Sequence, residues 1–157
     1  MPSPFKFEPA SIYKVNNYIF DDDNSVRDKY LIVLHINQEE LFLINTLTTT
    51  NKRTGKQDVF NGCNSQDGFH FYFFQEKHEI GKEKFFFDKN TYIFFYKNIR
   101  KQPISKYDEH IKNSSIMKLD SLTDYEYGRL LKCILKTKHI TPDIKKELAI
   151  VKEGISN

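Results

Sequence analysis

The sequence predicts a mainly β protein with helices at its C-terminal end (an α+β fold), built around a small, strongly bent antiparallel barrel. Short apolar runs rich in aromatic and β-branched residues recur between positions 11 and 104, without the strand–helix alternation of a parallel sheet. Two capped segments with helical spacing follow. We expect a single domain over 1–157, with the barrel in 8–107 and the helical part in 121–153.

Apolar runs bounded by turn-forming residues predict the strands. The continuous run YLIVLHI predicts a buried strand, and NQEE after it predicts a tight connection to the next run, so these two strands are expected to form a hairpin. A polar segment with three glycines predicts a long loop over 50–68. The predicted strands are 11–16, 30–36, 40–46, 69–75, 84–87, 91–96 and 99–104.

Capping residues predict where the two helices begin and end. Thr123 and Glu126 fit a capping box, in which the Thr hydroxyl accepts the third helical amide and the Glu side chain reaches back. Thr141-Pro142-Asp143 opens the second helix, because Thr caps, Pro fits the first turn and Asp favours the positive end of the dipole. Gly154 ends that helix.

The composition is typical of a globular protein, with 29% charged and 39% hydrophobic residues among 157. No apolar run approaches the roughly 20 residues that cross a bilayer, and MPSPFKFEPAS lacks the layout of a signal peptide. We therefore expect a cytoplasmic protein with no membrane contact. In that compartment Cys63 and Cys133, which lack a CxxC partner, are expected to be free thiols.

The charge is unevenly distributed along the chain. Residues 1–96 hold 11 Lys+Arg and 13 Asp+Glu, whereas residues 97–157 hold 13 and 8, so the C-terminal part has a net charge of +5. This surplus could attract phosphates, or it could belong to ordinary solvated helical faces.

No motif for a nucleotide, a metal protease or a serine hydrolase is present, and we expect no cofactor and no metal. The five histidines are scattered, which disfavours a zinc site. His70 follows the long loop and could lie at a barrel rim, where its near-neutral pKa suits proton transfer. The alternative for His70 is a structural role in its strand.

Cations and hydroxyls are expected to meet at one end of the predicted hairpin. Arg27 and Lys29 precede its first strand, and Thr48 and Thr49 follow its second. Antiparallel pairing places the start of one strand beside the end of the other. A cation next to a hydroxyl suits a phosphodiester, because both can stabilise charge on the phosphate oxygens. The alternative is an ordinary basic, Thr-rich edge.

Four segments carry a family resemblance. SIYKVN, RDKYLIVLH and LFLINTLTTT stand in the order of an opening strand, a strand that begins with arginine and a strand that ends in a threonine turn. In FFFDKNTYIFFYKNIRKQPISKY, Asn98-Ile99-Arg100 and Ile104-Ser105-Lys106 fill the slots of a Gln-Ile-Arg-Thr-Ile-Asp-x-x-Arg/Lys segment. Together these segments resemble the MazF/PemK (Kid-like) toxin family over roughly residues 8–138.

The resemblance implies an SH3-like barrel, a homodimer, and a toxin–antitoxin endoribonuclease that cleaves single-stranded RNA without a metal. The partners it implies are single-stranded RNA and an antitoxin protein. In the family the ribose 2′-hydroxyl attacks the adjacent phosphate, an arginine serves acid/base work and charge stabilisation, and a threonine holds the phosphate. The threonine corresponds to Thr48, with Thr49 beside it, and the arginine to Lys29, with Arg27 two residues earlier. RNA contacts are predicted at Lys52, Arg53 and Arg100.

Lys29 departs from the family pattern, because lysine is a point charge without the guanidinium fork. The Gly and Pro that frame the family's arginine are absent as well. Two other functions therefore stay open. One is an inactive barrel that binds RNA or a partner protein through the same rim, and the other is a structural or interaction domain with no nucleic-acid role.

Overall fold

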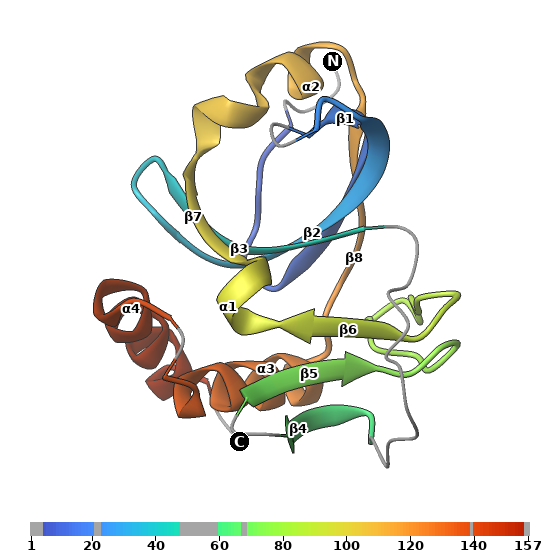
Figure 1. The fold of residues 1–157 in the computed structure, drawn as a ribbon. Helices are drawn as coiled ribbons and strands as arrows, with labels where there is room; N and C mark the ends of the chain where they lie inside the picture. Colours follow the sequence, from blue (N-terminus) through green and yellow to red (C-terminus); the bar gives the residue numbers. More distant parts are fainter. Residues whose placement is uncertain (1–4, 21–22, 48–59, 67–68, 139, 156–157) are drawn as a thin grey trace.

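The computed structural model of the protein describes residues 5–20, 23–47, 60–66, 69–138 and 140–155. In these ranges the chain folds into two antiparallel sheets, with two longer helices near the C-terminus (Figure 1). The prediction of a mainly β protein with C-terminal helices is therefore confirmed.

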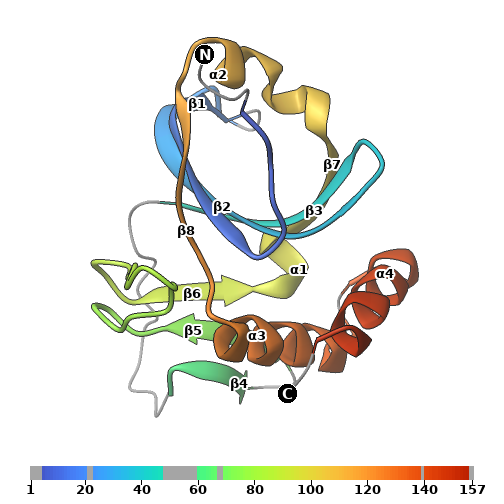
Figure 2. The same ribbon diagram turned by 180° about the vertical axis from the view of Figure 1, so that it is seen from behind.

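The larger sheet has five strands in the order β7-β3-β2-β1-β8. It curls strongly, and the connection between its two outer strands crosses over its concave side as η1 and α2 (Figures 1 and 2). No ladder joins β7 to β8 in the described chain, so these strands do not close into a barrel. The bounds are β1 (Ser11–Ile19), β2 (Val26–Asn37), β3 (Glu40–Leu47), β7 (Ile99–Pro103), η1 (Ile104–Tyr107), α2 (Asp108–Lys112) and β8 (Ile116–Ser121).

The predicted hairpin is formed by β2 and β3. Its register runs from Asn37 opposite Glu40 to Lys29 opposite Leu47. Gln38 in the tight turn adopts a φ of 59°, a left-handed conformation that the reversal of the chain requires. The hairpin prediction is therefore confirmed, and β2 extends four residues further towards the N-terminus than the apolar run alone indicated.

Both faces of the larger sheet are buried. Along β2, Leu31 and Val33 enter one apolar cluster, which also contains Tyr107 of η1. Ile32 and Leu34 enter a second cluster, shared with the smaller sheet and the C-terminal helices. Because successive side chains of a strand point to opposite faces, a strand buried on both sides needs a continuous apolar run.

The smaller sheet has the order β4-β5-β6 and lies beneath the larger one with α3 and α4 (Figure 1). α4 is tied to β2 by Glu147, whose carboxylate lies 3.2 Å from His35 Nε2 and accepts a hydrogen bond from Asn37. No helix of the described chain combines the length and apolarity that a membrane span needs. The bounds are β4 (Gly62–Gln66), β5 (Phe69–Phe74), β6 (Thr91–Phe94), α1 (Phe95–Asn98), α3 (Asp124–Lys136) and α4 (Pro142–Glu153).

The start of α3 differs from a full capping box. The Thr123 hydroxyl accepts the Glu126 amide at 3.1 Å, as predicted. The Glu126 carboxylate, however, turns into the core and accepts a hydrogen bond from the Tyr72 hydroxyl, while the Thr123 amide donates to Ile80 O at 3.0 Å. Burial, with the adjacent Glu126 carboxylate, raises the pKa of Tyr72. Glu126 therefore links α3 to β5 instead of closing its own cap.

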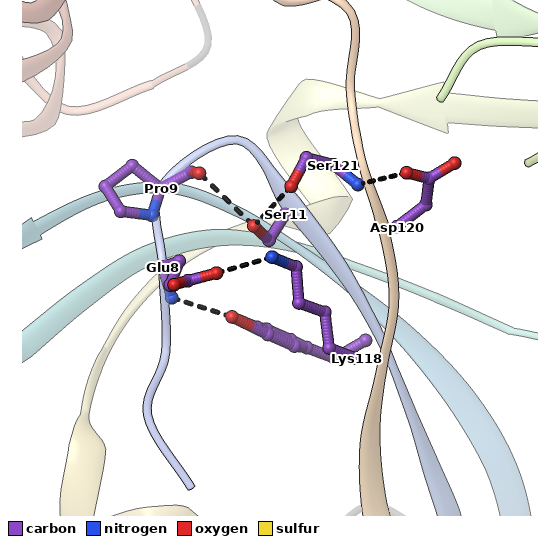
Figure 3. A network of polar contacts seen from close by, with 7 residues as sticks. Glu8, Pro9, Ser11, Lys118, Asp120 and Ser121 are labelled. Carbon is purple, nitrogen blue, oxygen red and sulfur yellow. Dashed lines mark hydrogen bonds and ion pairs between the residues drawn. The ribbon is translucent and has the colours of Figure 1, made fainter. Parts of the chain in front are cut away.

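Segment 84–87 was predicted as a strand, and this prediction is wrong. An aspartate on β8 holds it as a loop, because the Asp120 carboxylate accepts hydrogen bonds from the Glu83 amide at 3.0–3.1 Å and the Phe85 amide at 3.0 Å. The same strand anchors the segment before β1, where Lys118 contacts Glu8 and the Ser11 and Ser121 hydroxyls lie 3.2 Å apart (Figure 3). β8 thus connects two distant parts of the chain, the segment around 84–87 and the start of β1.

The two cysteines form a disulfide, so the prediction of free thiols is wrong. Cys63 on β4 and Cys133 on α3 are 70 residues apart in sequence, and their Cα atoms are 5.5 Å apart. The packing of α3 against the smaller sheet brings the two cysteines together. No local sequence pattern predicts this contact. The bond closes a long loop that includes all of β5, β6, β7 and β8.

We predict that Asp120→Ala destabilises the protein by about 3 kcal/mol, because partly buried backbone amides lose a charged acceptor that is itself buried. Urea unfolding followed by circular dichroism measures this loss. Glu153→Ala, which removes an exposed carboxylate near the end of α4, is the matched control and should change stability by less than about 0.5 kcal/mol. Equal stability of the two variants would contradict the anchoring role of Asp120.

Reduction of the Cys63–Cys133 bond should lower the free energy of unfolding by about 2–4 kcal/mol, because it frees a long loop in the unfolded chain. Alkylation under denaturing conditions, followed by mass spectrometry, should label neither cysteine before reduction and both afterwards. Cys63→Ser should reproduce the loss of stability without a reductant. Labelling of both thiols in unreduced protein would refute the bond.

Candidate functional site

Strand β2 brings Arg27 and Lys29 to the end of the larger sheet where β3 ends. Lys29 is paired with Val15 on β1 and with Leu47 on β3. Thr48 follows Leu47 in the sequence, and four of the predicted site residues lie outside the described residues: Thr48, Thr49, Lys52 and Arg53. The start of β2 and the end of β3 therefore lie side by side, as predicted, up to Leu47, the last described residue of β3.

Lys29 is a buried cation with only 3% of its surface exposed. Its Nζ lies 3.4 Å from the ring centre of Tyr18 and 5.3 Å from that of Tyr107, and it donates to the Tyr107 hydroxyl at 3.3 Å. Tyr107 in turn donates to Gln102 Oε1 at 2.6 Å. Burial raises the pKa of Tyr107, so this hydroxyl stays protonated. Two aromatic faces and one hydroxyl thus hold the ammonium in place of water.

Arg27 is the exposed cation of the pair. Its guanidinium lies 4.4 Å from the centre of the Phe20 ring, its Nε donates to Ser25 Oγ at 3.0 Å, and its Nη2 lies 3.7 Å from Asp23. Lys29 Nζ lies 5.9 Å from the same Phe20 ring. The two cations therefore share one side of β2, as their spacing of two residues predicts.

A pocket of about 650 Å³ opens between β1 and α2, and its lining residue Tyr18 lies against Lys29. A bulge between Val15 and Tyr18 shapes its β1 side, and Asn17 within the bulge has a φ of 56°. The Asn17 amide donates to Asp28 at 2.9 Å, which links the bulge to β2. The lining includes Asn16, Asn17, Tyr18, Lys106, His110 and Ser115, so most of its side chains can hydrogen-bond.

His110 of α2 is the titratable group that joins this pocket to Lys29. Its ring stacks on Tyr18 with centroids 5.6 Å apart, and its Nδ1 lies 2.8 Å from Ser115 Oγ. Burial, followed by the positive charge of Lys29, lowers the pKa of His110. The imidazole is therefore neutral at pH 7, and a neutral imidazole can accept a proton.

His110 was missed by sequence reasoning, which selected His70. His70 lies on β5 of the smaller sheet, opposite Ser65, and no contact between described residues joins it to Arg27 or Lys29. No local signal marks His110, because its place depends on the β1 bulge and on the packing of α2 over the concave side. Through Tyr18 the structure brings Lys29 together with His110, and not with His70, whereas the contacts of Arg27 are with Phe20, Ser25 and Asp23.

Arg100 lies on β7, opposite Leu43 of β3. It is exposed, and its guanidinium donates to Ile99 O at 2.9 Å. It does not line the pocket beside Lys29. Among the described residues, no group of three or more His, Cys, Asp and Glu side chains is arranged to hold a metal ion.

Taken together, the site offers three kinds of chemistry. The exposed Lys106 supplies positive charge beside the acidic Glu109 in the pocket lining, Arg27 adds positive charge on the neighbouring strand β2, and the buried Lys29 adds a fixed field. His110 supplies a neutral imidazole, and the asparagines at the bulge supply amide groups. This combination suits a polar ligand that carries a phosphate and undergoes proton transfer.

We predict that Lys29→Met raises the pKa of His110, because removal of a nearby cation favours the imidazolium. An NMR titration of the His110 ring measures the shift, and Arg27→Met, on the same strand, is the control that should leave it in place. The depressed pKa also means that the unfolded chain binds the His110 proton more readily than the folded one. Wild-type stability should therefore fall as pH drops below about 6.5, and less so in Lys29→Met. An unchanged His110 pKa in Lys29→Met would contradict the coupling.

No family model, no curated protein and no solved structure matches this chain. The chemistry assigned to the site therefore follows from its own residues and their geometry.

Proposed function

We propose that the protein is a toxin-like endoribonuclease, which cleaves single-stranded RNA without a metal as part of a toxin–antitoxin system. One observation carries this proposal. The β2–β3 register sets Lys29 opposite Leu47, so β3 ends beside this cation, at the residue that precedes Thr48 in the sequence. The curled antiparallel sheet supports a MazF/PemK-like, SH3-like scaffold, and the homodimer is the assembly that the family resemblance implies.

The reaction is an internal phosphoryl transfer. The ribose 2′-oxygen attacks the adjacent phosphorus, the new P–O bond forms, and the bond to the 5′-oxygen of the next nucleotide breaks. A base accepts the 2′ proton and an acid returns a proton to the leaving oxygen, which leaves a 2′,3′-cyclic phosphate and a 5′-hydroxyl. Positive charge near the phosphate lowers the barrier, because negative charge builds up on its oxygens in the transition state.

In the proposed reaction these roles are divided among the residues of the site. Arg27, which is exposed, contacts the phosphate and stabilises its charge together with the hydroxyls of Thr48 and Thr49. His110, kept neutral by burial and by Lys29, accepts the 2′ proton. Lys29 is buried under Tyr18 and acts through its field on His110, so it is a positioning residue. In this scheme the family's arginine role falls to Arg27, and Lys29 sets the electrostatics behind it.

A second function is favoured by the partners of the two cations. The Arg27 guanidinium is already engaged by Ser25, Asp23 and Phe20, and Lys29 is covered by aromatic rings. Such a rim suits a barrel that binds RNA, or a partner such as an antitoxin protein, without cleaving it. A structural domain with no nucleic-acid role is the third candidate.

Purified protein should convert a labelled single-stranded RNA into fragments with cyclic phosphate ends in the presence of EDTA. Arg27→Ala, Thr48→Ala and His110→Asn should each lower the rate by about 10²–10⁴-fold, because each removes charge stabilisation or proton transfer. Induced expression of the wild type should arrest growth, and the same variants should relieve the arrest. Lys89→Ala, an exposed lysine outside the site, is the control and should cleave like the wild type.

Two other results would separate the alternatives. Salt-sensitive binding of single-stranded RNA with no product would replace cleavage by the binding function, because phosphate contacts release counterions. Normal growth on strong expression, together with no RNA binding at low salt, would leave the structural domain.

A further inference from the structure

A second basic site lies far from the Lys29 pocket, on α3 and the end of α4. A groove of about 790 Å³ is lined there by four cations: Arg129, Lys132, Lys136 and Lys152. α3 lies in the lower layer of the molecule, whereas α2 lies at the opposite end, above the larger sheet (Figures 1 and 2). The groove shares no lining residue with the pocket beside Lys29.

The positive charge in this groove is largely uncompensated. Within the described ranges, no acidic side chain forms an ion pair with Lys132, Lys136 or Lys152. Asp124, which also lines the groove, lies 3.8 Å from Lys82. Arg129, Lys132 and Lys136 follow a spacing of three and four residues, so they share one face of α3, where like charges repel. This repulsion lowers the stability of the free protein. An anionic ligand that neutralises the cations would explain why the cluster is present.

The groove also offers an aromatic ring. Tyr125 is 71% exposed, and the guanidinium carbon of Arg129 lies 5.1 Å from its ring centre. Stacking on such a ring contributes about 1–3 kcal/mol per nucleic-acid base, and a cation near the ring adds to this. A large exposed ring beside four cations therefore combines the two elements that bind single strands.

Gly128 leaves space at the centre of the groove. Apart from its chain neighbours and the backbone of its own helix, no described heavy atom lies within 4 Å of where its Cβ would be. Glycine inside a helix costs about 1 kcal/mol relative to alanine, and no crowding in the described structure requires it here. Gly128 is itself buried, so what the missing side chain leaves is space in the groove lining rather than an exposed backbone.

We propose that this groove binds single-stranded RNA, with the phosphates along Arg129, Lys132, Lys136 and Lys152 and a base stacked on Tyr125. From Tyr125 to Lys136 the helix rises by about 16 Å, enough to contact several consecutive phosphates. An acidic polypeptide would also match the lysines, but it would gain nothing comparable from the exposed ring. This site goes beyond the proposed cleavage and does not depend on it.

The test uses a fluorescein-labelled 2′-O-methyl oligouridylate of about twelve nucleotides, which spans such a site and lacks the 2′-hydroxyl that cleavage needs. Fluorescence anisotropy with the full chain measures its affinity between about 50 and 200 mM salt. The double variant Lys132→Glu/Lys136→Glu should weaken binding by at least about tenfold. It should also reduce the slope of log affinity against log salt by about 1.4, the value for two phosphate contacts.

Three variants at two positions test the shape of the site without changing its charge. Tyr125→Ala should weaken binding by about tenfold, and Tyr125→Phe should restore it, because the stacking surface is kept. Gly128→Leu should fill the groove and weaken binding by a similar factor. Thermal unfolding by circular dichroism checks that each variant is folded.

Lys6→Glu/Lys89→Glu, which changes the net charge equally at exposed positions outside the groove, is the matched control and should bind within about twofold of wild type. An equal loss in this control, or unchanged affinity in the α3 variants, would overturn the proposal. So would binding of polyglutamate, but not of the oligouridylate, by the groove. Binding that depends on α3, with no cleavage of natural RNA, would sustain this site while refuting the proposed activity.

Discussion

The burial of the larger sheet on both faces is the constraint on which the rest of the structure depends. Side chains of β2 enter two separate apolar clusters in alternation. One face requires the smaller sheet, α3 and α4 as a cover. The other requires the curl of the sheet itself, with η1 and α2 across its opening (Figure 1). Removal of either cover would expose a full row of apolar side chains, so neither layer is an accessory to the fold.

The candidate site lies where the apolar cluster that contains Leu31, Val33 and Tyr107 meets the solvent. The electrostatics of the site follow from that position. A lysine at 3% exposure is costly unless its charge is stabilised. Tyr18 and Tyr107 provide this stabilisation, and Tyr18 also stacks on His110. The fold therefore couples a buried charge to a titratable ring at the surface. The basic groove on α3 differs, because Lys132 and Lys136 are exposed and lie one helical turn apart, where like charges repel.

Much of the fold could be predicted from local patterns. The apolar run of β2 and the short connection after it identified the hairpin, and Thr123, Pro142 and Gly154 marked helix ends that the structure confirms within one or two residues. The strands β4 and β8 were missed, because GCNSQ and IMKLDS show little apolar alternation and depend on their neighbours for pairing. The run FFF was wrongly predicted as a strand. The hydrogen bonds that Asp120 accepts from this segment are tertiary contacts, which a local pattern does not reveal.

The candidate site was predictable only in part, for the same reason. Spacing along β2 and β3 placed Arg27 and Lys29 beside the end of β3, because pairing register is a local property of a hairpin. The burial of Lys29, the choice of His110 over His70, and the Cys63–Cys133 bond all depend on contacts between distant segments.

The pairing of β1 with β8 has a further consequence, for folding kinetics. Ser11 and Ser121 are 110 residues apart and lie in adjacent strands, so the sheet cannot be completed until most of the chain is available. Such long-range pairing gives a high contact order and slow folding. During synthesis the edge of β1 that pairs with β8 stays unpaired until β8 has been made. Exposed strand edges of this kind are sites where aggregation begins.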